Sequence, residues 1–172
     1  MTTLLTVNAS AQTEERSITR RLTREFVESF VSARPGAKIV ERDVGHSPPP
    51  FVDTEFIEAA FTPADDRTAK MVEVLSVSDQ LIDEVISSDV IVLGAPMYNY
   101  GMPAALKAWF DQIARIGRTF SFDLDRGDHP IRPMLSGKTL VVLSSRGEFG
   151  FEPGGIRGSS NALDPAIAAC AH

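Results

Sequence analysis

The sequence of 172 residues contains a single cysteine, Cys170, so the chain cannot form an internal disulfide bond. It has no apolar run long enough to span a membrane and no charged amino-terminal region followed by a long apolar one. The formal net charge is −6, and acidic and basic residues are mixed along the chain rather than gathered into a basic stripe. These absences predict a protein of the cytoplasm that binds neither nucleic acid nor a membrane.

Familiar catalytic motifs are also missing. No G-x-G-x-x-G follows the first expected strand, and no G-x-S-x-G occurs anywhere in the chain. The histidines at 46, 129 and 172 lack the spacing of metal ligands, so the sequence predicts no metal site. Cys170 lies in a small apolar stretch, where we expect it to pack rather than react. The lack of an evident acid, base or nucleophile suits an enzyme whose chemistry resides in a cofactor.

What the chain does contain is an alternation of strand patterns and helix patterns. The expected strands are Thr3 to Ala9, Lys38 to Val44, Val90 to Gly94 and Thr139 to Leu143. Helical patterns start at Ser17 and Asp65 and cover Ala104 to Ile116 and Leu163 to Ala171. Such an alternation predicts a parallel α/β sheet with right-handed crossovers, and the length suits one domain over residues 1–172.

The stretch from Val90 to Phe120 organises this pattern. Val90 to Leu93 is a continuous apolar run, typical of a strand that is covered on both faces. Pro103 suits the start of a helix, and this helix has one apolar face, formed by Leu106, Trp109, Phe110 and Ile113. Between strand and helix lies a loop with two aromatic rings, an amide and a thioether. Because open α/β sheets bind ligands at the carboxyl ends of their strands, we expect a binding site here.

Two further loops follow strands and carry hydrogen-bonding groups. Ser10 to Ser17 precedes a helix, whose free backbone N–H groups and positive dipole end can hold a phosphate, with hydroxyls from Ser10, Ser17 and Thr19. The alternative is that Ser17 is simply a helix N-cap. The stretch of residues 144–151 is a second polar, glycine-bearing loop after a strand.

Two longer segments are less regular. Residues 45–64 hold four prolines among the apolar residues Phe51, Val52, Phe56, Ile57 and Phe61. We expect this segment to pack on the body or on another subunit, with a flexible cover as the alternative. Residues 118–138 are expected to be irregular.

The loop and helix after Val90 resemble the signature of FMN-dependent NADH azoreductases, also called FMN-dependent NADH:quinone oxidoreductases. The matching residues are Ala95-Pro96-Met97-Tyr98-Asn99-Tyr100, Leu106-Lys107 with Trp109-Phe110-Asp111, and Thr119-Phe120. The resemblance runs from the first strand to about residue 169. It implies a flavodoxin-like fold, a homodimer, and one FMN at each of two sites near the subunit interface.

The resemblance also assigns roles to residues. Ser10, Ser17, Ile18 and Thr19 match the residues that bind the FMN phosphate, and Pro96, Met97, Tyr98, Asn99 and Tyr100 match the loop at the isoalloxazine ring and ribityl chain. Ser145, Arg146 and Gly147 match a Ser-Arg-Gly-Gly loop beside the flavin, with Glu148 in place of the second glycine. Tyr100 and Phe122 match positions in the substrate pocket, while Phe120 is expected to anchor its loop by packing.

The implied sheet order is 2-1-3-4-5, and members of the family end in a fifth strand and a final helix. The chain stops at His172, so we expect a sheet of order 2-1-3-4 that lacks the fifth edge strand, in a C-terminally truncated domain. The resemblance implies transfer of two electrons from NADH through FMN to quinones and aromatic azo compounds. The alternatives are a flavodoxin-like electron carrier and a non-catalytic remnant that binds a protein partner.

Overall fold

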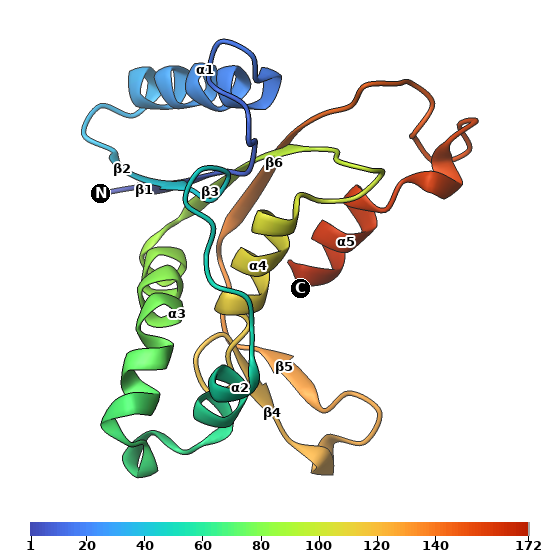
Figure 1. Ribbon diagram of the computed structural model, residues 1–172. Coiled ribbons are helices and arrows are strands. Elements are labelled where there is room, and N and C mark those ends of the chain that lie inside the picture. Colours follow the sequence, from blue (N-terminus) through green and yellow to red (C-terminus); the bar gives the residue numbers. More distant parts are fainter. Residues whose placement is uncertain (172) are drawn as a thin grey trace.

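The computed structural model, which describes residues 1–171, has a four-stranded parallel sheet at its centre (Figure 1). The strands are β1 (Thr3–Asn8), β2 (Lys38–Asp43), β3 (Val90–Pro96) and β6 (Thr139–Ser145). Their order is β2-β1-β3-β6, which confirms the predicted 2-1-3-4 arrangement of a flavodoxin-like sheet. Within this sheet Leu5 of β1 lies opposite Val40 of β2 and Ile91 of β3.

Five α-helices accompany the sheet (Figure 1). They are α1 (Ile18–Ala33), α2 (Thr54–Phe61), α3 (Ala69–Ser87), α4 (Ala104–Ile113) and α5 (Leu163–Cys170). Helix α1 covers one face, where Phe30 packs with Leu4 and Val92. Helices α3, α4 and α5 cover the other face. Because successive strand residues point to opposite faces, the continuous apolar runs of β1 and β3 supply both cores.

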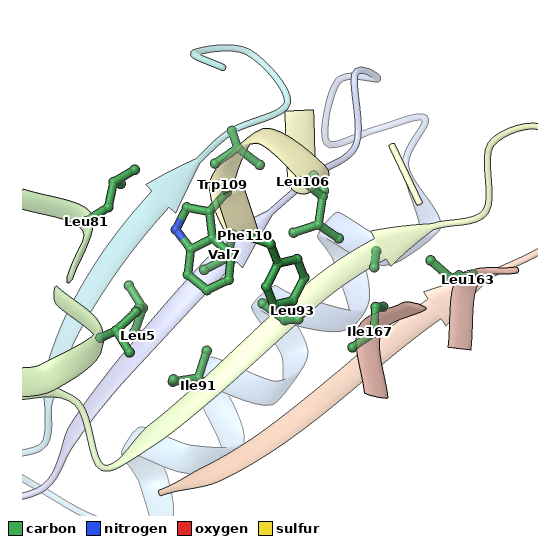
Figure 2. Close-up of a cluster of buried hydrophobic side chains, with 14 residues drawn as sticks. Leu5, Val7, Leu81, Ile91, Leu93, Leu106, Trp109, Phe110, Leu163 and Ile167 are labelled. Atoms are coloured by element: carbon green, nitrogen blue, oxygen red, sulfur yellow. The ribbon is translucent and has the colours of Figure 1, made fainter. Parts of the chain in front are cut away.

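The larger core lies between the sheet and helices α3, α4 and α5 (Figure 2). Trp109 and Phe110 of α4 meet edge to face at 5.0 Å and pack on Leu93. Helix α5 contributes Leu163 and Ile167, and its last turn is exposed. Cys170 is therefore exposed, and the expectation that it packs was wrong.

Helices α3 and α4 are shorter than the sequence pattern predicted. Ala64–Asp66 forms a separate 3-10 turn, and α3 starts only after Thr68, whose side chain caps it. Helix α4 ends at Ile113 because the Arg115 N–H donates to the Thr119 hydroxyl at 3.0 Å. The Arg115 carbonyl then accepts three N–H groups from residues 118–120, which closes a turn instead of a further helical turn.

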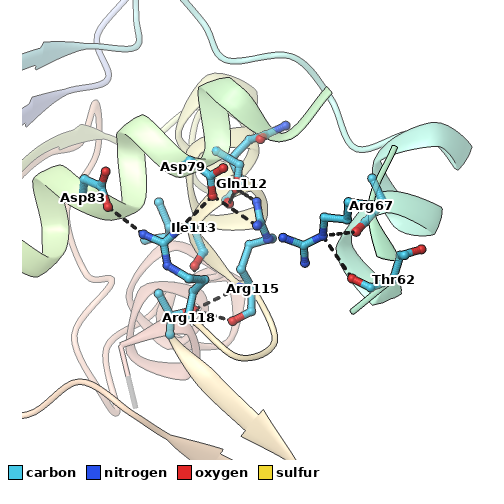
Figure 3. A network of polar contacts seen from close by, with 11 residues as sticks. Thr62, Arg67, Asp79, Asp83, Gln112, Ile113, Arg115 and Arg118 are labelled. Atoms are coloured by element: carbon cyan, nitrogen blue, oxygen red, sulfur yellow. Dashed lines mark hydrogen bonds and ion pairs between the residues drawn. The ribbon is translucent and has the colours of Figure 1, made fainter. Parts of the chain in front are cut away.

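A buried arginine links this turn to α3 (Figure 3). The Arg115 side chain is fully buried and donates to Ser78 at 2.9 Å and to Asp79 at 3.1 Å. Arg118 donates to the same Asp79 and to Asp83. The network therefore fixes the root of the segment that follows α4.

That segment contains a hairpin, so the expectation that residues 118–138 are irregular was wrong. Strands β4 (Phe120–Phe122) and β5 (Ile131–Pro133) pair antiparallel, with Phe122 opposite Ile131. Each strand has only three residues, which is too short for a sequence period to reveal. The hairpin lies beyond the carboxyl end of α4 (Figure 1).

Residues 45–64 were expected to pack through their apolar side chains, and only part of that expectation was correct. Phe56 is buried, and it packs with Ala59 and Ala60 against Leu75 of α3. The other four do not pack on the body and remain partly to largely exposed in one chain: Phe51, Val52, Ile57 and Phe61. For these four, packing on another subunit stays a prediction. The side chain of Asp53 caps α2 by accepting the Phe56 N–H at 2.8 Å.

Candidate functional site

Three loops converge at the carboxyl ends of β1, β3 and β6. The Ala11 N–H donates to the Tyr98 hydroxyl at 3.2 Å, which joins the loop after β1 to the loop after β3. The Met97 N–H donates to the Ser145 carbonyl at 2.9 Å, which joins the end of β3 to the end of β6. In flavodoxin-like sheets this edge, beside the first strand, is the switch point at which ligands bind.

The loop after β1 offers a set of hydrogen-bond donors. Ser17 is the N-cap of α1, as one interpretation of the sequence predicted: its hydroxyl accepts the Arg20 N–H at 3.2 Å. The same hydroxyl lies 3.2 Å from that of Thr19, and Ser10 is buried nearby. Among residues 1–171, the N–H groups of Ile18 and Thr19 have no acceptor, as expected of a first helical turn. The Ile18 side chain is half exposed, so this residue offers its backbone.

Arg20 supports this loop from behind, a role that the sequence did not reveal. It donates to the Ser10 carbonyl at 2.5 Å and forms a two-pronged pair with Asp43 at 2.7 and 2.8 Å. Burial pushes the pKa of Asp43 up, but hydrogen bonds from Arg20 and from the His46 N–H outweigh it and leave the pKa below its ordinary value. Asp43 is therefore an ionised anchor at the end of β2.

Gly45 lets the chain after β2 approach this loop. A Cβ atom at position 45 would lie 2.1 Å from the Ser10 carbonyl oxygen, a distance no side chain tolerates. The Gly45 N–H donates to the Asn8 carbonyl at 3.0 Å. The loop after β1 is thus held between β2 and the Tyr98 hydroxyl.

The loop after β3 is a tight turn in a strained conformation. Strand β3 continues to Pro96, which is buried, and Met97 packs against the core. Tyr98 and Gly101 exchange two backbone hydrogen bonds of 3.0 Å, with Asn99 and Tyr100 at the tip. Both tip residues have positive φ, 47° and 67°, which is costly for a tyrosine. The side chains of Tyr98 and Tyr100 remain partly exposed.

The turn is held by the segment before α5. The Ala162 N–H donates to the Tyr100 carbonyl at 2.9 Å, and the rings of Tyr100 and Phe151 lie 6.1 Å apart. Contacts with Ala162 and Phe151 hold the backbone and the ring of Tyr100. Its conformation is therefore specified by tertiary contacts rather than by local preference.

Charged side chains of the loop after β6 are paired within the protein. Arg146 contacts both oxygens of Asp164 at 2.6 Å and lies over the Phe151 ring at 5.8 Å. Glu148, which replaces the expected glycine, forms an ion pair with Arg157. Neither pairing was predicted, because the partners lie 18 and 9 residues away in sequence. Glu148 is accommodated with its charge compensated.

Phe122 is not brought together with Tyr100 within one chain. It lies on the β4–β5 hairpin, beyond the carboxyl end of α4, whereas the Tyr98–Gly101 turn precedes the amino end of that helix. A ten-residue helix spans about 15 Å. Phe120 lines an apolar cavity of about 480 Å³ with Trp109 and Leu135, so its anchoring role by packing stays a prediction.

Residues 1–171 contain neither a cluster of metal ligands nor a helix suited to cross a membrane. No three histidine, cysteine or acidic side chains gather closely enough to hold a metal ion in this part of the chain. None of the described helices combines the length and apolar character that a membrane crossing requires.

Known proteins resemble this chain over nearly its whole length. A family described by its flavodoxin-like fold matches residues 2–171. The FMN-dependent NADH:quinone oxidoreductase 2 of Idiomarina loihiensis is 50% identical over 97% of this chain and 72% of its own length. The FMN-dependent NAD(P)H:quinone oxidoreductase 1 of Pseudomonas aeruginosa is 44% identical over 96% of this chain and 78% of its own length.

Solved structures agree with the fold. An azoreductase crystal structure from Bacillus anthracis superimposes with a TM-score of 0.86 over 99% of this chain and 80% of that one, at 24% identity. The resemblance stated from the sequence is thereby confirmed. The chain belongs to the flavodoxin-like family of FMN-dependent NADH:quinone oxidoreductases.

Proposed function

We propose that this protein is an FMN-dependent oxidoreductase that transfers two electrons from NADH to quinones and to aromatic azo compounds. The observation that carries the proposal is the convergence of three donor-rich loops at the switch point of the sheet, joined through Ala11, Tyr98, Met97 and Ser145. The names of the relatives at 44–50% identity support FMN as the cofactor, with NADH as the donor in one name and NAD(P)H in the other.

The residues of the first loop fit a phosphate group. The unpaired N–H groups of Ile18 and Thr19 and the positive end of the α1 dipole attract an anion without a lysine. The hydroxyls of Ser10 and Ser17 add donors beside them. We assign these four residues to the phosphate of FMN.

The second and third loops suit the ring system of FMN. We assign the ring and ribityl chain to Pro96 through Tyr100 on one side and to Ser145 through Glu148 on the other. The N–H groups of Asn99 and Gly147 have no acceptor in the described chain, so they can stabilise negative charge on a bound ring. The exposed ring of Tyr100 offers a flat surface for stacking.

When bound, FMN supplies two-electron redox chemistry, because its ring accepts a hydride from NADH and passes two electrons to an acceptor. NADH, a proton and a quinone thus become NAD⁺ and a hydroquinone, and an azo compound needs two such rounds to give two amines. The protein residues bind and orient the reactants, and protons come from solvent. A cytoplasmic setting, in which NADH is available, belongs to the proposal.

A homodimer completes the proposal. Phe122, Leu124 and Ile131 expose apolar surface on the hairpin, and Phe51 and Phe61 do so near α2. We infer that a second copy covers this surface and that the hairpin of one protomer brings Phe122 to the three loops of its partner. This arrangement accounts for the separation of Phe122 from Tyr100 within one chain.

Steady-state kinetics test the proposed function. The purified protein, loaded with FMN, is assayed for NADH oxidation with 1,4-benzoquinone and with an azo dye, and its mass is measured by light scattering. We expect flavin that survives gel filtration, parallel double-reciprocal lines and a dimeric mass. Protein that retains no flavin and oxidises no NADH would contradict the enzymatic proposal, whereas a monomer with full activity would contradict only the dimer.

A further inference from the structure

The loop between β6 and α5, residues 146–162, is braced across its width by Arg157. The Arg157 guanidinium forms an ion pair with Glu148, donates to the Phe149 carbonyl at 3.0 Å and lies over the Phe149 ring at 5.2 Å. The Arg157 N–H donates to the Gly150 carbonyl at 2.7 Å. Four interactions thus join Arg157, in the second half of the loop, to residues 148–150 in its first half.

The two limbs approach each other closely. A Cβ atom at Gly155 would lie 2.5 Å from the Gly150 carbonyl oxygen, so only glycine permits this approach. Gly155 also donates its N–H to the Glu152 carbonyl at 2.9 Å. The loop is a compact structure rather than a slack connection.

The braced loop is anchored to the Tyr98–Gly101 turn. Phe151 is buried, its ring lies 6.1 Å from that of Tyr100, and its carbonyl accepts from the Asn161 amide at 3.1 Å. The neighbouring Ala162 donates to the Tyr100 carbonyl. Phe149 is two residues from Phe151, so its backbone lies within about 7 Å of the residue that contacts the strained turn.

Phe149 nevertheless has a side chain that is 76% exposed. A large aromatic ring that a braced loop holds in solvent next to a binding site is placed where it can contact a ligand. Its backbone and ring are both fixed by Arg157. The ring can therefore meet a flat ligand with little further loss of conformational freedom.

We propose that Phe149 is a specificity-determining residue that selects flat, apolar electron acceptors, and that Arg157 and Glu148 are its positioning residues. This proposal rests on the function proposed above. A quinone or an aromatic azo compound binds mainly through its flat apolar faces, so contact with the Phe149 ring contributes a large share of its affinity. NADH also carries phosphates and ribose hydroxyls, so the same ring makes up a smaller share of its binding.

The test compares Phe149→Ala and Phe149→Tyr in FMN-loaded protein. Equilibrium dialysis measures 1,4-naphthoquinone binding without turnover, and stopped-flow absorbance follows flavin reduction by NADH and reoxidation by naphthoquinone separately. For Phe149→Ala we expect naphthoquinone binding and reoxidation to weaken about tenfold, and reduction by NADH to change less than about threefold. Phe149→Tyr keeps an aromatic ring and should retain both. Reoxidation by ferricyanide, which has no flat apolar face, should stay within about twofold.

A second pair of variants tests the positioning residues. Arg157→Gln removes the ion pair, so we expect amide hydrogen exchange at residues 148–150 to accelerate and naphthoquinone binding to weaken about threefold. Arg157→Lys retains a charge but not the planar fork, and should restore binding only in part.

The outcomes separate the two proposals. If wild-type protein holds FMN and is reduced by NADH, but Phe149→Ala binds naphthoquinone as wild type does, the acceptor role is refuted and the proposed function stands. If Phe149→Ala instead weakens the dimer with no change in naphthoquinone binding, Phe149 is a subunit contact and the acceptor role is again refuted. Wild-type protein that neither holds FMN nor reacts with NADH overturns both proposals.

Discussion

The hydroxyl of Tyr98 accepts a hydrogen bond from the backbone N–H of Ala11 across 87 residues of sequence. It joins the two loops assigned to the phosphate and to the ring of FMN. Tyr98→Phe removes the acceptor and leaves the N–H of Ala11 without it, so we expect FMN affinity to fall about fivefold. Fluorescence titration with FMN measures the change.

Tyr100→Phe is the matched control for this prediction. Within the described chain the Tyr100 hydroxyl has no hydrogen-bond partner in the protein, so its removal should change FMN affinity by less than about twofold. Equal losses in the two variants would show that the link between the loops has no special role.

Ser17 is expected to have two separable roles. As an N-cap it stabilises α1, and Ser17→Ala should lower the free energy of unfolding by about 1 kcal/mol. As a phosphate ligand it should favour FMN over riboflavin, so the same variant should lose about tenfold in FMN affinity and almost none for riboflavin. Urea unfolding and ligand titration measure the two effects.

Thr68→Ala provides the comparison for Ser17→Ala, because Thr68 caps α3 in the same manner, far from the loops. We expect a similar loss of stability of about 1 kcal/mol with FMN affinity unchanged. A Ser17→Ala variant that binds FMN as tightly as Thr68→Ala does would limit Ser17 to capping.

The positive φ of Tyr100 predicts that glycine is more stabilising than alanine at this position, the reverse of the usual order in a helix. Tyr100→Gly and Tyr100→Ala lose the same ring, but glycine adopts this conformation without strain, so the glycine variant should be more stable by about 1 kcal/mol. At exposed Glu73 in α3 the order should be the usual one, with alanine favoured by about 1 kcal/mol. The same order at both positions, measured by urea unfolding, would contradict the turn conformation.

The lowered pKa of Asp43 predicts a dependence of stability on pH. Its ionised form favours the folded state above the unfolded pKa of about 3.9, and that contribution is lost as the pH falls through the lower folded pKa. Asp43→Asn should therefore be less stable than wild type at about pH 6, and the difference should shrink below about pH 3. Urea midpoints across this range measure it.

Asp128→Asn serves as the control for Asp43→Asn, because Asp128 is exposed and forms no ion pair with any residue from 1 to 171. Its stability should follow that of wild type at each pH. A difference between Asp43→Asn and wild type that stays constant with pH would mean that Asp43 stabilises the fold without its charge.

The main sheet was predictable from the sequence because the composition of its strands differs clearly from that of the neighbouring segments. The runs at Val90 and Thr139 are continuous and apolar, which indicates strands, although β6 at the sheet edge leaves Leu140 and Val142 partly exposed. The helix from Ala104 showed a clear apolar face. The β4–β5 hairpin could not be predicted, because strands of three residues carry no period. The buried Arg115 gave no signal either, since its partners on α3 are 36 and 37 residues away.

The sequence predicted which loops form the candidate site, but it did not predict the ion pairs that hold these loops in place. Tyr98 and Asn99 lie in the turn directly after β3, and Ser17 ends the loop between β1 and α1, so all three lie in loops that follow strands. Arg20 with Asp43 and Glu148 with Arg157 form pairs that depend on the folded arrangement. Tyr100 and Phe122 were both expected in the substrate pocket. The length of α4 separates them within one chain, so a shared pocket depends on the proposed dimer.

An anaerobic titration of the FMN-loaded protein shows whether two electrons pass from NADH through the bound flavin to a quinone. We expect one equivalent of NADH per bound FMN to bleach the flavin absorbance, and one equivalent of 1,4-benzoquinone then to restore it with formation of hydroquinone. Flavin that remains bound but keeps its absorbance in the presence of excess NADH would rule out this electron transfer.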